Sequence, residues 1–381
     1  MDIKSITSFG DNLYAQNRDQ DGSGVGYSFR LSNGGTANLS TYTFGVSEDK
    51  SFTQELRASV QATDRIRATI GGFYNNYEAD TQFSLYVDAS PLPTGVNPII
   101  LFPIGASRNG PPPANIQFVR LEDEEYSAFG ILDIEASEQL NFSAEARYSR
   151  QRKFQNQSGG FLTIPATDPD GANGLNGNFN LWSFRFTGEY DISPSAMIYA
   201  SAAKGNKAGG FNSGLVNPAD VVYDPEVNWT YELGFKTDLL GGRALFDATL
   251  FYSDLSGIQL FGFAETGTGS IITNGGDADA YGFEVALSGE IASGFNAAVG
   301  LAYANPRFKD GSLLNSSASV GQCRNIPACA NRVVTVNGRT ALDLGGLSLP
   351  RQSDWQATAQ FDIEQPLTDR FDWTFRGNYK Y

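Results

Sequence analysis

The chain has 381 residues, a net charge of −15, 13% aromatic residues and no histidine. No apolar run reaches the roughly 18 residues that a membrane-spanning helix needs, so a helical membrane protein is excluded. Without histidine the chain cannot build Ser-His-Asp catalysis or His-ligated zinc or haem, and without a basic run it has no footprint for nucleic-acid phosphates.

Apolar and polar residues alternate with a period of two along most of the chain, which predicts strands with two unlike faces. We count about thirteen such strands. They lie at 3–17, 52–61, 65–86, 126–136, 140–151, 179–190, 196–204, on both sides of Gly241-Gly242, and at 281–291, 295–306, 355–364 and 371–381.

The clearest strand pair surrounds the Gly241-Gly242 turn. Tyr231 and Leu233 fall on one side of the first arm, and Glu232 and Lys236 fall on the other. Each arm can run for ten residues or more, which is longer than the five or six usual in soluble sheets. Long arms with one apolar and one polar face are typical of a transmembrane antiparallel β-barrel.

The connections also alternate in length. Short turns are predicted near residues 64, 138, 193, 241, 293 and 367, and long loops at about 89–124, 153–178, 205–227, 256–279 and 307–352. Outer-membrane barrels combine tight periplasmic turns with extended extracellular loops in this way. A soluble β-sandwich has shorter strands, and a β-propeller would repeat every 40–45 residues or so, which this chain does not.

Two sets of side chains follow from the two faces. Aromatic residues near strand ends are expected in the interfacial girdles, namely Tyr148, Tyr190, Tyr252, Tyr303, Trp355 and Trp373. Charged residues on the opposite face are expected to line the lumen and to pair across strands, namely Glu55, Arg57, Arg67, Glu145, Arg147, Arg185, Glu189, Glu232, Lys236, Glu284 and Arg376.

Metal and cysteine chemistry is sparse. Cys323 and Cys329 have five residues between them in a loop-like stretch with no further ligand, so a disulfide is expected rather than a metal site. The acidic segment 168–173 (DPDGAN) lacks the remaining spacing and the terminal Glu of a calcium loop and is interpreted as a solvated loop. We therefore expect no metal and no cofactor.

Residues 199–214 (YASAAKGNKAGGFNSG) and 223–260 resemble the barrel of TonB-dependent outer-membrane receptors, in particular large receptors of sphingomonad-like proteobacteria. The resemblance implies a barrel of about 22 strands whose lumen is plugged by an N-terminal domain. It also implies a place in the outer membrane of a Gram-negative bacterium and uptake of a scarce nutrient, such as a ferric siderophore. The energy would come from the proton gradient through the TonB–ExbB–ExbD complex.

The family pattern is incomplete in this sequence. No plug domain, TonB-contact segment or signal peptide is recognisable, and thirteen is an odd strand number for a single-chain bacterial barrel. Residues 1–381 are therefore expected to be a single partial barrel domain, with the plug and the terminal strands absent and the TonB contact made by the missing N-terminal region.

The leading hypothesis is thus active transport without enzymatic activity, since the usual general base of a barrel enzyme is missing. The alternative is a passive porin-like channel. Ligand contacts are expected in the extracellular loops, where cationic side chains could attract an anionic chelate. The candidates are Arg108, Arg120, Lys207, Arg324 and Arg332.

Overall fold

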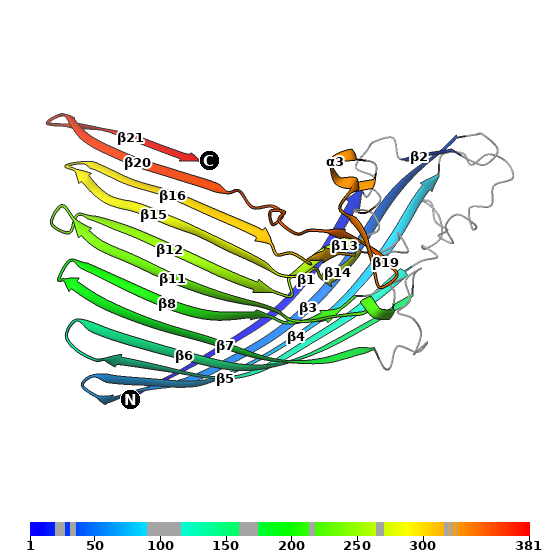
Figure 1. The fold of residues 1–381 in the computed structure, drawn as a ribbon, viewed down its shortest axis with the longest axis horizontal. Helices are drawn as coiled ribbons and strands as arrows, with labels where there is room; N and C mark the ends of the chain where they lie inside the picture. Colours follow the sequence, from blue (N-terminus) through cyan, green and yellow to red (C-terminus); the bar gives the residue numbers. More distant parts are fainter. Residues whose placement is uncertain are drawn as a thin grey trace.

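The computed structural model describes residues 1–19, 27–30, 36–89, 116–159, 174–212, 218–263, 270–315, 320, 323–324 and 326–381. Thirteen strands follow one another in a single antiparallel sheet (Figure 1), and the short β2 (Tyr27–Arg30) pairs with β3 beside them. The thirteen are β1 (Asp2–Asp19), β3 (Thr36–Thr63), β4 (Ile66–Ala89), β5 (Ile116–Glu135), β6 (Leu140–Gly159), β7 (Leu175–Ser193), β8 (Ala196–Lys207), β11 (Glu226–Leu239), β12 (Ala244–Ser256), β15 (Ala278–Ala292), β16 (Phe295–Phe308), β20 (Trp355–Thr368) and β21 (Phe371–Lys380).

The sheet confirms the predicted architecture. Each strand pairs with its neighbours along the chain, and β1 and β21 form the two margins because no described pairing joins them. Figure 1 shows the sheet curving between these margins. Among the described residues, no helix has the length and apolar character needed to cross a membrane.

The short connections all lie at one end of the sheet, called here the turn end, and the long ones at the other, the loop end. Turns at 64–65, 136–139, 194–195, 240–243, 293–294 and 369–370 join the strands at the turn end, as predicted. Several strands reach farther toward the loop end than their alternation indicated. β5 begins at Ile116 rather than near residue 126, and β3 begins at Thr36 rather than near residue 52.

Three of the predicted loops contain additional β-structure, which corrects the expectation of irregular connections. β9 (Gly210–Phe211) pairs with β10 (Val222–Tyr223), and β13 (Gln259–Phe263) pairs with β14 (Ser270–Asn274). The connection from β16 to β20 holds β17 (Leu313–Leu314), β19 (Arg339–Asp343) and β18 (Val333–Val336), together with the helical turn α3 (Pro327–Ala330). Together these segments between β8 and β20 are called the cap.

The strand register keeps the two faces separate across the sheet. Partners on neighbouring strands point to the same side, and the pairing places all eleven charged residues predicted for the lumen on one face, called here the inner face. The outer face instead exposes large apolar side chains, including Leu56 at 55%, Ile70 at 68% and Leu233 at 55%. This is the distribution that a lipid-facing wall around a polar lumen requires.

A chain of aromatic contacts follows the outer face toward the loop end. Ring centroids lie 5.0 Å apart for Tyr74–Tyr126, 5.0 Å for Tyr148–Trp182 and 4.7 Å for Tyr303–Trp355. Tyr252 continues this row from β12 through its stacking on Tyr231 at 6.4 Å. Tyr190 and Trp373, the other two residues predicted for a girdle, lie near the turn end. The aromatics thus mark two levels of the wall, as two membrane interfaces would.

Candidate functional site

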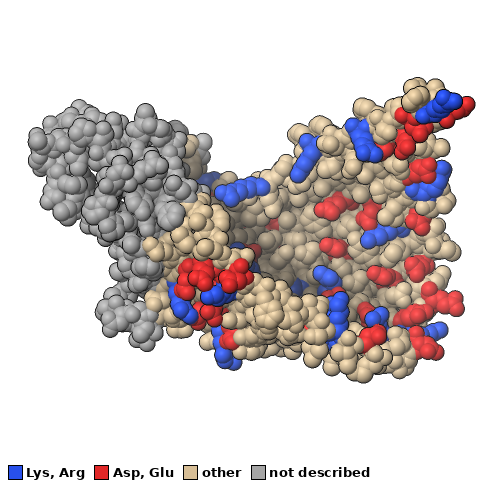
Figure 2. Space-filling model, turned by 180° about the vertical axis from the view of Figure 1, so that it is seen from behind, with Lys and Arg blue, Asp and Glu red and all other residues tan. Residues whose placement is uncertain are grey.

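The inner face of β3 to β8 is hollowed by two adjoining cavities. The first, of about 510 Å³, lies at the turn end and is lined from β3 to β7 and from the turn between β3 and β4. The second, of about 460 Å³, lies farther toward the loop end. Glu145 and Arg185 line both, so the two form one groove along the wall. Figure 2 shows charged side chains of both signs spread over the hollowed surface of the sheet.

Guanidinium groups recur at successive levels of this groove. Four inward positions of β6, spaced two residues apart, define the levels: 147, 145, 143 and 141. Arg147 occupies the first, and Arg185 of β7 is the register partner at the second. At the third level, Arg67 of β4 is the register partner of Asp133, which in turn pairs with position 143. At the fourth, Glu135 pairs with position 141, and its backbone amide donates a hydrogen bond to the Arg65 carbonyl. These four arginines are called the ladder.

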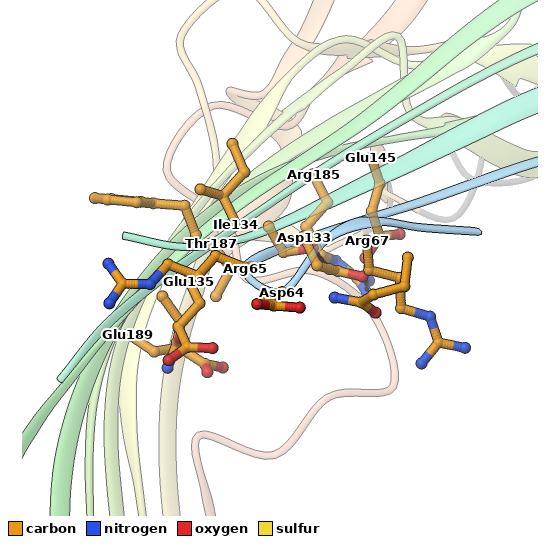
Figure 3. A pocket seen from close by; sticks show the side chains of 14 residues that line it. Asp64, Arg65, Arg67, Asp133, Ile134, Glu135, Glu145, Arg185, Thr187 and Glu189 are labelled. Atoms are coloured by element: carbon orange, nitrogen blue, oxygen red, sulfur yellow. Dashed lines mark hydrogen bonds and ion pairs between the residues drawn. The ribbon is translucent and has the colours of Figure 1, made fainter. Parts of the chain in front are cut away.

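A carboxylate accompanies the ladder at each level. Glu145 lies at the second level and Asp133 at the third, while Glu135 and Glu189 flank position 141 at the fourth. At the first level Glu125 reaches Arg147 from β5. In the close view, Glu145 and Arg185 lie together at one end of the first cavity, and Glu135 and Glu189 lie at the other (Figure 3). The groove is therefore strongly ionic but nearly balanced in charge.

The first level of the ladder is firmly held. The Arg147 guanidinium donates from Nη2 to Glu125 Oε1 at 2.8 Å and to Ser127 Oγ at 2.9 Å, and from Nε to Ser149 Oγ at 3.2 Å. Its Cζ also lies 5.1 Å from the centre of the Phe73 ring, within cation–π range. With this many partners, Arg147 has little freedom to reorient.

The lower levels are held progressively less. Arg185 Nη1 lies 3.7 Å from Glu145 Oε1, and the two side chains are 59% and 39% exposed. Arg67 and Arg65 are exposed and have no ion pair with any described residue. Exposed ion pairs of this kind contribute only about 0–1 kcal/mol. The ladder thus passes from a fixed guanidinium to free ones toward the turn end.

Three aromatic rings on the inner face, those of Phe129, Tyr199 and Phe251, lie over glycines of the neighbouring strand. The Phe129 ring covers Gly71, and the Tyr199 ring covers Gly234, so that a Cβ at either glycine would collide with the ring. Tyr199 is held there by a 2.9 Å hydrogen bond between its hydroxyl and that of Thr249, and by the Lys236 ammonium 5.3 Å from its centre. Each pair requires glycine because the ring occupies the space of its side chain.

The inner face of β15 and β16 has a different character. Its inward positions carry mostly small residues without charge: Ala280, Gly282, Ala286, Ala298, Gly300, Ala302 and Ala304. Two glutamates are the charged exceptions: Glu284, and Glu290 nearer the turn end. At the loop end this face continues into Ala278 and Phe308, which pair with each other and are buried.

The cap packs on that end of the inner face. Ile258, Ala278, Phe308 and Leu344 form a buried cluster, against which six partly buried leucines pack: Leu255, Leu260, Leu314, Leu342, Leu347 and Leu349. Burial of large apolar side chains on this scale stabilises a local unit. The chain between β16 and β20 therefore folds inward over the β12–β16 side of the mouth.

Polar contacts join the separate loops of the cap to one another. The Asn212 amide donates to the Asp220 carbonyl at 2.6 Å and the Ile272 carbonyl at 2.7 Å, and its oxygen accepts the Ile272 amide at 2.7 Å. The Arg339 guanidinium binds both oxygens of the Asp220 carboxylate, at 2.8 and 2.5 Å. Bidentate pairs of this type combine strength with fixed geometry. Three loops that are distant in sequence are thereby held together.

Two titratable groups at the loop end are shifted by these contacts. The hydrogen bond that Lys309 donates to Asp254, at 2.6 Å, raises the pKa of the Lys309 ammonium above 10.5. Burial within the cap raises the pKa of the Tyr223 phenol. Both groups stay in their ordinary protonation state at neutral pH.

The predicted ligand-contact residues do not converge on one site. Arg108 lies outside the described residues. Arg120 is on the outer face, 2.7 Å from Glu122, while Lys207 is exposed at the end of β8, opposite Glu226 on the inner face. Arg324 is exposed near α3. Arg332 donates to the backbone carbonyl of Gly345 at 2.9 Å, which gives it a structural contact within the cap.

The two cysteines lie in the cap, where the structure joins Cys323 to Cys329 by a disulfide next to α3. Among the described residues, no group of three or more Asp, Glu or Cys side chains is arranged to hold a metal ion. The ladder itself was not singled out by the sequence. Arg67, Arg147 and Arg185 were predicted only as part of the lumen lining, and Arg65 was not predicted as a lumen residue. The signal that unites the four is the strand register.

Comparison with known proteins agrees with the two-faced sheet. The family model "TonB dependent receptor-like, beta-barrel" matches residues 3–381. Among solved structures, the ferric yersiniabactin uptake receptor FyuA of Yersinia pestis aligns over 91% of this chain and 47% of its own, with a TM-score of 0.63 at 15% identity. The ferric preacinetobactin receptor BauA of Acinetobacter baumannii covers 99% and 49%, with a TM-score of 0.61 at 12% identity.

The copper transporter OprC is similar as well, covering 99% of this chain and 52% of its own, with a TM-score of 0.58 at 14% identity. At such identities the likeness concerns the fold. The chain spans about half the length of these solved structures.

Proposed function

The chain belongs to the TonB-dependent receptor family, whose β-barrel it represents over residues 3–381, and from that premise we propose that it acts in the active uptake of a scarce nutrient such as a ferric siderophore. Its place is the outer membrane of a Gram-negative bacterium. The outer face, with its exposed leucines and isoleucines between two aromatic levels, is then bounded by lipid. The loop end faces the exterior and the turn end the periplasm.

The observation that carries this proposal is the family match along nearly the whole chain. Two of the similar structures are receptors for ferric siderophores and another is a copper transporter, which supports a metal-bearing nutrient. The ionic inner face supports a polar cargo, because charged walls hydrate a lumen and bind groups of opposite charge. The proposal includes transport without catalysis.

The proposed energy source is the inner-membrane proton gradient. A TonB–ExbB–ExbD complex would couple to the receptor through a region N-terminal to the barrel. The ligand would be captured at the loop end, where the predicted contact residues Arg108, Lys207 and Arg324 remain candidates.

Uptake by whole cells tests the proposal. Cells that express the full-length receptor in a background without other iron receptors are offered radioiron-labelled hydroxamate, catecholate and carboxylate siderophores. At least one chelate is expected to accumulate, and a protonophore is expected to abolish accumulation while surface binding persists. Accumulation that continues without the gradient would instead identify a passive porin-like channel. In that case the purified protein would also conduct ions in a planar bilayer.

A further inference from the structure

The outer face of β6, β7 and β8 carries three cationic side chains, in a chain whose net charge is −15. Arg150 and Arg152 occupy successive outward positions of β6, and Lys204 occupies an outward position of β8. No aspartate or glutamate occupies a described outward position of these three strands. These three residues, called here the cationic patch, therefore have the sign opposite to that of the whole molecule.

Two of the three cations have no carboxylate partner. Arg150 is exposed, its register partners are Tyr126 and Asn180, and it forms no ion pair with any described residue. Lys204, whose register partners are both aromatic, likewise has no ion pair within the described part of the chain. The other outward cations of the large sheet whose side chains are described are all paired: Lys50 with Glu48 at 2.7 Å, Arg120 with Glu122 at 2.7 Å, Arg152 with Glu124 at 3.4 Å and Arg307 with Asp354 at 3.4 Å.

The cationic patch lies at the level of the aromatic row near the loop end. Arg150 is one outward position beyond Tyr148, whose ring lies 5.0 Å from that of Trp182. The Trp182 ring stacks in turn on Phe184 at 5.8 Å, and Phe184 is the register partner of Lys204. Aromatic side chains of this kind lie at the depth of the lipid headgroups. The unpaired guanidinium and ammonium groups are thus expected at the depth of the headgroup phosphates.

From this position we infer that the cationic patch binds a phosphorylated glycolipid of the outer leaflet, with two phosphate groups on its sugar headgroup. The inference concerns the lipid side of the wall and does not depend on the uptake function. A guanidinium binds phosphate oxygens through its planar fork, and an ammonium binds them as a point charge. Because Arg150 and Lys204 have no ion pair to break, a lipid phosphate can bind them without displacing a protein carboxylate.

The separation of the two unpaired cations favours a headgroup with two phosphates. Arg150 and Lys204 lie on either side of β7, roughly 10 Å apart across the strands and four residues, or roughly 13 Å, apart along them. Both side chains are long and can reach toward each other over β7. This span suits phosphates at opposite ends of a disaccharide, whereas a single phosphate cannot contact both cations.

The surface between the two cations is uncharged and can face a sugar headgroup. Asn180 is exposed on β7, and its Oδ1 accepts a hydrogen bond from the Tyr148 hydroxyl at 2.8 Å. Its amide nitrogen has no partner among the described residues, so it remains a donor for a sugar hydroxyl. Trp182, two residues farther along β7, is also exposed. The patch thus offers cations at its two ends and neutral donors between them.

The neighbouring part of the outer face is less suited to a phosphate. Toward the loop end of β3, β4 and β5, the outward positions carry more carboxylates than cations: Glu48, Glu78, Asp80, Glu122 and Glu124 against Lys50 and Arg120. A phosphate there would face like charges, which are unfavourable at close range. Glu124 is already engaged, since its Oε1 accepts the Tyr126 hydroxyl at 2.6 Å and its Oε2 the Arg152 guanidinium at 3.4 Å.

Binding of lipid A to the purified full-length receptor tests the inference. Native mass spectrometry in detergent measures the affinity for diphosphoryl, monophosphoryl and dephosphorylated lipid A, which share their acyl chains. The diphosphoryl form is expected to bind at least about tenfold more tightly than the monophosphoryl form. Arg150→Gln and Lys204→Gln are each expected to weaken its binding about tenfold, the effect of losing one charge-assisted contact.

Matched variants separate the cationic patch from general charge. Lys50→Gln removes an outward cation that is already paired with Glu48, and it is expected to leave lipid A binding unchanged. Arg150→Lys keeps the charge but loses the fork, so its affinity should lie between those of the wild type and Arg150→Gln. Arg150 is exposed and without an ion pair, so its replacement leaves the fold intact. The compact electrophoretic mobility of the unheated barrel verifies this for each variant.

Several outcomes would overturn the inference. Equal binding of the diphosphoryl and dephosphorylated forms would show that the wall contacts acyl chains alone. Unchanged affinity in both Arg150→Gln and Lys204→Gln, or an equal loss in Lys50→Gln, would remove the cationic patch as the site. Inorganic phosphate that displaces lipid A at an equal concentration would identify a site for free anions rather than for a lipid headgroup.

Discussion

The inner face differs sharply between β3–β7 and β15–β16, although one sheet and one pattern of register carry both. The first region projects arginines and carboxylates at every level and is hollowed into a groove. The second projects mainly alanine and glycine, and its loop end is covered by a packed cap. The backbone frame is therefore shared, and the two sides of the lumen are distinguished only by which residues occupy the inward positions.

This difference indicates which part of the wall is rigid and which part can rearrange its side chains. The cap has an apolar cluster and joined loops, so it behaves as a fixed part of the mouth. The groove has exposed ion pairs, which exchange partners at little cost. A ligand is thus expected to meet a rigid rim on one side and a polar, rearrangeable surface on the other.

Truncating a side chain at the centre of the cap should have the largest effect, because it removes the cluster that makes the capped side rigid. Phe308→Ala deletes a buried ring from the cluster with Ile258 and Leu344 and is expected to cost about 3–5 kcal/mol of local stability. Hydrogen exchange of the Leu344 and Gly346 amides, which bond to Ser312 and Phe308 carbonyls, should accelerate at least about 100-fold. Leu301→Ala, on the outer face of the same strand, should change these rates little. Unchanged protection in Phe308→Ala would show that the cap is not held by this cluster.

Removing the anchor of the groove should have an intermediate effect. Arg147→Met leaves Glu125, whose side chain is 16% exposed, without its cation and is expected to lower stability by roughly 2 kcal/mol. The thermal midpoint of the receptor in detergent measures this change. Arg376→Met serves as the control, since its side chain is 77% exposed. Adding Glu125→Gln should recover part of the loss, and a double variant as unstable as the sum of both singles would contradict the pairing.

High pH should have the smallest effect on stability, and this effect should be confined to the cap. The folded-state pKa of Lys309 is raised, so the stabilisation from its bond to Asp254 is present below the unfolded value of 10.5. It is lost as pH rises through the folded pKa. Proteolysis of the cap between about pH 9 and pH 12 should reveal a modest loosening. Lys309→Arg should remove the pH dependence because guanidinium stays charged, and an equal response of both proteins would assign the loosening to another group.

The sequence predicted the wall well because the wall depends on local alternation. The two arms around Gly241-Gly242 pair as expected, with Tyr231 opposite Tyr252 and Leu233 opposite Leu250. Inward charges such as Glu232 and Lys236 also fall where their spacing placed them. An alternating pattern fixes the face of a residue without knowledge of its neighbours.

The cap and the ladder could not be predicted in the same way. β9 and β10 have only two residues each, which is too short for a period to show, and they exist because Gly210 and Tyr223 meet across a loop. Likewise, Arg67 and Arg185 belong to one groove only because β4, β5, β6 and β7 pair in a particular register. Such contacts depend on residues distant in the chain, about which a local pattern carries no information.

The flat rings over glycine affect the width of the lumen. Phe129 and Tyr199 are among the bulkiest inward side chains, and rings standing upright would narrow the bore by their own length. Lying over Gly71 and Gly234, they occupy volume that belongs to the wall. The glycine and its ring therefore define the free cross-section jointly. A larger residue in place of the glycine would push the aromatic ring into the lumen, and a smaller residue in place of the aromatic would leave a hollow in the wall. The two positions of each pair are therefore expected to change together over evolutionary time.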